Sequence, residues 1–127
     1  MAQRCLIVDD SHRFLDAARS TLERQGIQVV GTATTTAEAL QRAEALRPDV
    51  VLVDISLGDE SGFELTRRLV DDLRTRVVLI STRAEDDYAD LVATSPAVGF
   101  LSKSQLSGGA LRQLLLGESG TNALPGT

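Results

Sequence analysis

The sequence has few of the residues that crosslink a protein or anchor it in a membrane. Cys5 is the only cysteine among the 127 residues, which excludes an internal disulfide. No apolar run approaches the length that spans a bilayer, and none follows the first residues as a leader would, so neither secretion nor membrane insertion is indicated. We expect a protein of the reducing cytoplasm, with Cys5 packed as a small buried hydrophobe.

The chain also lacks an excess of basic residues. It carries 18 acidic against 13 basic side chains, which gives a net charge of −5. Proteins that bind nucleic acid usually present a basic surface, so we expect no direct nucleic-acid binding by this domain, and any link to DNA through a partner. Hydrophobic residues make up 43% of the sequence, which at this length is enough for the core of one domain.

The sequence does contain a fivefold alternation of short apolar runs with segments of helical periodicity. The expected strands are residues 4–8, 27–31, 50–53, 77–80 and 98–101. The expected helices are residues 11–25, 35–46, 63–73, 85–94 and 106–115. In the first helix Ser11 is a good N-cap, and Phe14 lies on the apolar face. This alternation predicts a doubly wound α/β domain with a five-stranded parallel sheet and helices on both faces.

Three carboxylates follow two of the expected strands. Asp9 and Asp10 close the run at residues 6–8, and Asp54 closes the run at 50–53. Parallel strands bring their carboxyl ends to one edge of the sheet, where open α/β sheets bind their ligands. Three anions at one place raise each other's pKa unless a cation is present, and oxygen ligands of this kind suit Mg²⁺. A single acid after a strand is usually a turn residue, but this set predicts a divalent-metal site.

The strand ends, read in chain order, are similar to one known family. An acidic pair follows the first strand, an acid the third, a hydroxyl the fourth and a lysine the fifth, as Asp9-Asp10, Asp54, Ser81 and Lys103. With these residues the sequence resembles the receiver domain of two-component response regulators, over residues 4 to about 116. The resemblance implies a flavodoxin-like (βα)5 domain over residues 1–116, and residues 117–127 are predicted to be a flexible tail or a truncated linker.

The resemblance assigns a phosphoacceptor role to the site. Asp54 is the implied nucleophile, which accepts a phosphoryl group from the phosphohistidine of a sensor histidine kinase or from a small phosphodonor. Lys103 and Ser81 are the implied partners of the phosphoryl oxygens. Each of these residues alone has an ordinary structural explanation, and only the combination favours the functional one.

The resemblance also implies the ligands of Mg²⁺. Asp10 binds the ion directly and Asp9 binds it through water, together with Asp54 and the backbone carbonyl of Ser56. Such an ion neutralises the carboxylates and the charge that develops on the phosphoryl group.

A conformational switch is the third implication. Phe100 matches the position of the family's switch aromatic, whose ring turns into space that Ser81 vacates, although a phenylalanine within a strand is commonly plain core. The switched face comprises the fourth helix, the fifth strand and the fifth helix, which control an output partner or domain and allow homodimerisation on phosphorylation. The sequence leaves open whether a DNA-binding domain follows in a longer protein.

Two departures from the family pattern concern the backbone. The family commonly has a proline with a cis peptide after the lysine, whereas Ser104 follows Lys103 here, so a trans bond is expected. This variant resembles receivers of the NarL/LuxR type. Gly58 stands where many receivers have proline, which predicts a looser loop.

Other departures flank the site. Thr82 is larger than the usual alanine or glycine and is expected to narrow the approach of water and phosphodonor. Arg83 and Ser56 occupy the two variable flanking positions. His12, the only histidine, follows the acidic pair and has no assigned role.

Three other kinds of protein compete with a signalling receiver as explanations of this sequence. A phosphohydrolase with an aspartyl nucleophile needs a second acid two residues later, where this sequence has Ser56. A flavin or dinucleotide module would open its first helix with a Gly-x-Gly-x-x-Gly motif, which is missing. A degenerate receiver used only for docking would not need the full set of site residues. We therefore expect a phosphoacceptor domain and not an enzyme that turns over a foreign substrate.

Overall fold

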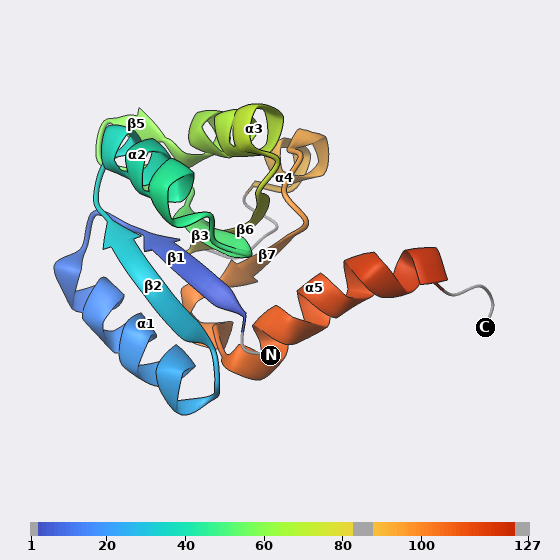
Figure 1. The fold of residues 1–127 in the computed structure, drawn as a ribbon. Helices are drawn as coiled ribbons and strands as arrows, with labels where there is room; N and C mark the ends of the chain where they lie inside the picture. Colours follow the sequence, from blue (N-terminus) through green and yellow to red (C-terminus); the bar gives the residue numbers. More distant parts are fainter. Residues whose placement is uncertain (1–2, 83–87, 124–127) are drawn as a thin grey trace.

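Five parallel strands form the central sheet in the computed structural model, which describes residues 3–82 and 88–123 (Figure 1). The strands are β1 (Arg4–Val8), β2 (Gln28–Ala33), β3 (Val50–Asp54), β6 (Arg76–Ser81) and β7 (Gly99–Ser102). They lie side by side in the order β2-β1-β3-β6-β7. The chain reverses its direction of winding after β2, so β1 and β3 are neighbours at the centre of the sheet.

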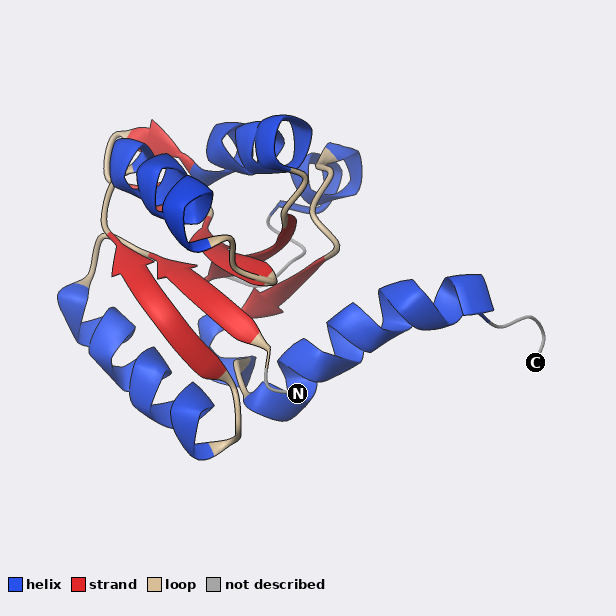
Figure 2. Cartoon of the chain, in the orientation of Figure 1, coloured by secondary structure: helices blue, strands red, loops and turns tan. Residues whose placement is uncertain are grey.

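Helices cover both faces of this sheet (Figure 2). They are α1 (His12–Arg24), α2 (Thr36–Leu46), α3 (Gly62–Leu73), α4 (Ala89–Thr94) and α5 (Gly108–Ala123). Alternate strand residues point to opposite faces, so Cys5 and Ile7 pack with α1 and α5, whereas Leu6 and Val8 pack with α2 and α3. The predicted doubly wound fold is confirmed. Burial raises the pKa of the Cys5 thiol to about 12, as fits a cysteine that serves as core.

The start of one helix agrees with the capping residue predicted from the sequence, and the predicted start of another falls outside the described residues. Ser11 caps α1, as predicted, because its side chain accepts a hydrogen bond from the Phe14 backbone N–H at 3.2 Å. Helix α4 begins at Ala89, and Glu85 to Asp87, where we predicted its start, lie outside the described residues. None of the helices in the described ranges is long and apolar enough to cross a membrane.

The last helix differs from the prediction of a tail. Helix α5 continues past Gly117 to Ala123 and projects away from the sheet (Figure 1). Leu111 and Leu115 anchor its first turns in the core. Adding residues to an anchored helix costs far less than starting one, which accounts for a helix in a segment whose composition disfavours it.

A short antiparallel hairpin between β3 and α3 was not predicted. It consists of β4 (Ser56–Leu57) and β5 (Glu60–Ser61). Gly58 in its turn has a φ of 63°, a value that proline cannot adopt, so glycine suits this loop where many receivers have proline. The Glu60 carboxylate accepts a hydrogen bond from the Thr36 backbone N–H at 2.8 Å, which ties the hairpin to the start of α2.

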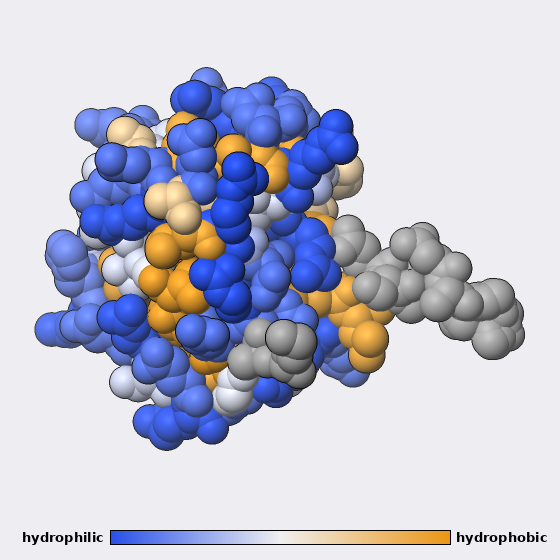
Figure 3. Space-filling view, viewed as in Figure 1, coloured by the Kyte–Doolittle hydropathy of each residue, from blue (hydrophilic) through white to orange (hydrophobic). Residues whose placement is uncertain are grey.

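Strand β2 forms an exposed edge of the sheet, between α1 and α2. Apolar surface lies along this side of the molecule (Figure 3), and it includes Val30 and Leu46 in a groove of about 660 Å³. A bulge interrupts the pairing of β2 with β1, and the Arg42 guanidinium donates a hydrogen bond to the Thr32 carbonyl. Both features discourage another strand from pairing with this edge.

Gly62, the first residue of α3, allows the chain to pack directly against the end of β3. A Cβ atom at this position would lie 2.0 Å from the Asp54 carbonyl oxygen and 2.8 Å from the Ile55 Cα. Both neighbours are backbone atoms, which cannot move aside without shifting the site.

We therefore predict that Gly62→Ala lowers the free energy of unfolding by about 3 kcal/mol, the upper end of the usual cost of overpacking. Urea denaturation would measure the change. Gly109→Ala is the matched control, because a Cβ atom there has no neighbour within 4 Å and alanine favours the helix. Equal stability of Gly62→Ala and the parent protein would contradict the close packing of α3 on Asp54.

Candidate functional site

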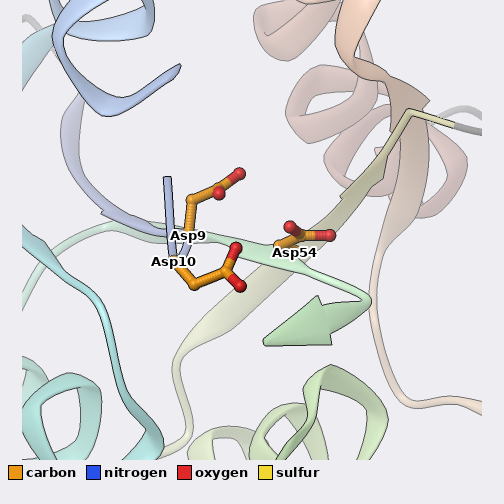
Figure 4. Close-up of side chains that lie close together, drawn as sticks. All are labelled: Asp9, Asp10 and Asp54. Carbon is orange, nitrogen blue, oxygen red and sulfur yellow. The ribbon is translucent and has the colours of Figure 1, made fainter. Parts of the chain in front are cut away.

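Three carboxylates meet at the carboxyl edge of the sheet (Figure 4). Asp9 and Asp10 follow β1, and Asp54 ends β3, whose Val53 pairs with Val8 of β1. One carboxylate oxygen from each of the three residues lies within 4.8 Å of the others. Adjacent parallel strands thus bring together acids that are 44 residues apart in the chain.

Two of these carboxylates are removed from solvent and are held by local backbone groups. Asp9 is fully buried and Asp54 is 6% exposed, whereas Asp10 is exposed. The Ser11 N–H donates a hydrogen bond to Asp9 Oδ1 at 2.8 Å, and the Ser56 N–H donates one to Asp54 Oδ1 at 3.1 Å. In both residues Oδ2 is left to interact with other groups.

Lys103 supplies the positive charge for both Oδ2 atoms. Its Nζ lies 2.5 Å from Asp9 Oδ2 and 3.2 Å from Asp54 Oδ2. Burial of the ammonium would lower the pKa of Lys103, but the hydrogen bond to Asp9 and the attraction of both carboxylates outweigh this effect and raise it. Lys103 is therefore a protonated ammonium at neutral pH.

The environment of Asp54 disfavours the ionised form of its carboxyl group. Burial and the nearby Asp9 carboxylate raise the pKa of Asp54, the Ser56 hydrogen bond and the attraction of Lys103 lower it, and the net result is a pKa of about 6. At neutral pH Asp54 is mostly a carboxylate that has lost much of its solvation. Such a group gains strongly from an added cation, and it is a better nucleophile than a fully hydrated carboxylate.

The other predicted site residues lie around this centre. Ser81 is 5% exposed at the end of β6, and it pairs in register with Ser102, the residue before Lys103. Phe100 is half-buried and pairs with Leu79, so Phe100 and Ser81 lie on the same face of the sheet. In the described part of the chain all peptide bonds are trans, which confirms the prediction for the bond after Lys103.

The residues that flank the site are more exposed. Thr82 is exposed, and Ser56 begins the hairpin after Asp54. Arg83 lies outside the described residues. His12 is exposed on the first turn of α1, and it is one of the groups that help to lower the pKa of the Glu38 carboxyl, after the hydrogen bonds from Thr34 and the attraction of Arg42.

Phe14 is a site residue that the sequence did not reveal. Its ring centroid lies 4.4 Å from Lys103 Nζ, within the range of a cation–π contact. Helical periodicity places Phe14 on the apolar face of α1. Nothing in the sequence around Phe14 indicates a contact with Lys103, which follows 89 residues later. The same applies to the Asp9–Lys103 ion pair, because the sequence indicates only that both residues lie at one edge.

The comparisons with known proteins agree with this geometry. The family model of the response regulator receiver domain matches residues 5–115. The receiver domain of the putative response regulator NarL from Mycobacterium tuberculosis superposes with a TM-score of 0.78 at 27% identity, covering 90% of this chain and 97% of that one. The response regulator domain of Thermotoga maritima CheB superposes with a TM-score of 0.75 at 27% identity, covering 98% of this chain and 100% of that one.

Curated relatives are longer than this chain. Response regulator GacA of Pseudomonas viridiflava is 34% identical over 106 residues, which cover 79% of this chain and 48% of GacA. A protein-glutamate methylesterase/protein-glutamine glutaminase of Halobacterium salinarum is 31% identical over 114 residues, which cover 90% of this chain and 33% of that protein. The chain thus spans between a third and a half of the length of these two relatives. The match of both sequence and fold over nearly the whole chain shows that it belongs to the response regulator receiver domain family.

Proposed function

We propose that this receiver domain accepts a phosphoryl group on Asp54 from a sensor histidine kinase, in a reaction that depends on Mg²⁺. The observation that carries the proposal is the position of Asp54. It is a nearly buried carboxylate with a raised pKa, with two more acids within 4.8 Å and a lysine ammonium at 3.2 Å. A nucleophile, a set of oxygen ligands and a cation for the phosphoryl oxygens are thus together at one strand edge.

The three carboxylates fit a hard divalent cation. Asp9, Asp10 and Asp54 each offer an oxygen in one small region, and Asp10 is open to solvent. Together with the backbone carbonyl of Ser56 they are the proposed ligands of Mg²⁺. The bound ion would offset the repulsion between the carboxylates and the negative charge of the phosphoryl group.

The proposed chemistry is the transfer of a phosphoryl group from a nitrogen or oxygen atom of the phosphodonor to a carboxylate oxygen of Asp54. An Asp54 oxygen forms a bond to phosphorus while the bond from phosphorus to the phosphodonor breaks, and its electron pair leaves with the donor group. The Lys103 ammonium, already beside Asp54, balances charge on a phosphoryl oxygen, and Ser81 donates its hydroxyl to another. No acid stands two residues after Asp54, where an aspartyl phosphohydrolase needs one, since Ser56 occupies that place.

The proposed output surface consists of α4, β7 and α5. Ser81 and Phe100 share one sheet face, and Phe100 packs in the same core as Val92 of α4. Helix α4 spans six residues, none of them buried, so few contacts oppose its movement. We propose that phosphorylation draws Ser81 toward the phosphoryl group and lets Phe100 turn inward, which changes this surface for an output partner, an output domain or a second copy of the chain.

The first prediction from the proposed function is that incubation with acetyl phosphate and Mg²⁺ adds one phosphoryl group, labile to hydroxylamine, and that Asp54→Asn prevents the addition. Intact-mass spectrometry measures both results. Asp59→Asn is the matched control, because Asp59 is an exposed acid in the same loop and should be labelled like the parent protein. Undiminished labelling of Asp54→Asn would show that another residue is the acceptor.

A second prediction concerns the metal. Mg²⁺ should bind weakly before phosphorylation, because few protein oxygens reach it, and Asp10→Ala should abolish labelling in millimolar Mg²⁺. EDTA should have the same effect on the parent protein. Asp16→Ala removes an exposed acid from α1 and should change nothing. Labelling rates that are equal in Asp10→Ala and the parent, or unaffected by EDTA, would refute a metal role for Asp10.

A third prediction concerns the lifetime of the phosphorylated state. Loss of phosphate requires water to attack phosphorus in line, and Thr82 is an exposed residue that lines the approach beside Lys103. We expect slow self-dephosphorylation, which Thr82→Ala accelerates without reducing the final extent of labelling. The measurement follows phosphate loss after the donor is removed. An unchanged or slower loss in Thr82→Ala would mean that Thr82 does not restrict access of water.

A further inference from the structure

We propose that Phe14 is a positioning residue for Lys103: its ring holds the ammonium beside Asp54 when a cation engages the Asp9 carboxylate. The inference rests on the proposed function, because it concerns how Lys103 stays available for the phosphoryl group. The observation behind it is the distance of 4.4 Å from Lys103 Nζ to the Phe14 ring centroid. At this distance the face of an aromatic ring attracts a cation.

The two carboxylate contacts of Lys103 are not enough to hold its ammonium beside Asp54 once a divalent cation binds. The shortest contact of Nζ is to Asp9 Oδ2, at 2.5 Å, and Asp9 is also one of the three acids that can surround a cation. A divalent cation and an ammonium compete for the same negative charge, so loading the site weakens the Asp9–Lys103 pair. The contact with Phe14 involves no carboxylate, and a divalent cation among the acids leaves it in place.

The position of the Phe14 ring is itself fixed by the site. The Phe14 N–H donates a hydrogen bond to Ser11 Oγ at 3.2 Å, and the Ser11 N–H donates one to Asp9 Oδ1 at 2.8 Å. The half-buried ring also packs against the core under α1 and α5. The start of α1 therefore holds the ring at a set place relative to Asp9.

A cavity beside the site leaves room for the Lys103 side chain to move away from the carboxylates. About 550 Å³ of space lies beside the site, and its lining includes Phe14, Lys103, Ala17, Thr21 and Ser104. Among the residues that the structure describes, none that lines this space is acidic, so an ammonium that enters it leaves both carboxylates. A lysine side chain has a flexible four-carbon stem, and an aromatic wall on its cavity side restricts that movement.

The chain offers a direct probe, because Lys103 is its only lysine. With ¹³C-labelled lysine, NMR shows one Cε methylene signal, and the Phe14 ring current should shift its protons upfield of free lysine. We expect the upfield shift to persist when Mg²⁺ is added, to vanish in Phe14→Leu and to remain in Phe14→Tyr. Phe63→Leu is the matched control, because Phe63 packs on the opposite face of the sheet and should leave the signal unchanged.

The rate of labelling by acetyl phosphate at fixed Mg²⁺ tests the consequence. We expect Phe14→Leu to be about five- to tenfold slower than the parent protein, with Phe14→Tyr close to the parent, since the ring face and not the apolar volume holds the ammonium. A Lys103 signal at the free-lysine position, with or without Mg²⁺, would overturn the inference, and so would an unchanged rate in Phe14→Leu. Failure of the proposed function looks different, because the parent protein itself would then gain no phosphoryl group on Asp54.

Discussion

The contact of one ammonium with two desolvated carboxylates sets the conditions for the rest of the site. Asp9 and Asp54 are both removed from water, which is costly for charged groups unless they are paired and hydrogen-bonded. Lys103 provides the pairing, at 2.5 Å from Asp9 and 3.2 Å from Asp54. The compensation is incomplete, since the pKa of Asp54 stays raised. The site therefore retains a net demand for positive charge, which is the property that favours a divalent cation.

The sheet topology makes this arrangement possible. Asp9 and Asp54 end neighbouring central strands, and Lys103 follows β7 at the far edge, so three distant segments reach one point. Gly62 and the β4–β5 hairpin fix the chain after Asp54, which keeps the proposed phosphoacceptor on rigid backbone. The proposed output surface lies at the other side of β6, where α4 has no buried residue. A rigid acceptor beside a loosely held helix is the combination that a phosphorylation switch needs.

The features that depend on local sequence preferences were predicted correctly. The apolar runs became strands, Ser11 capped α1, and the acids after β1 and β3 met at the predicted edge. The hairpin after Asp54 was missed, because two pairs of residues carry too little pattern to indicate strands. The length of α5 was wrong for a related reason: composition describes what a segment prefers alone, whereas an anchored helix propagates into it.

The sequence by itself determined the order of the elements, their apolar faces and the kinds of side chain at each strand end. These are local properties, set by periodicity and by the alternation of strands and helices. Only the tertiary structure decided which groups touch: that Lys103 pairs with Asp9 as well as Asp54, and that the Phe14 ring lies against its ammonium. The reason is that a contact at 3 to 4 Å depends on strand register, helix packing and rotamers together, which no stretch of the sequence specifies alone.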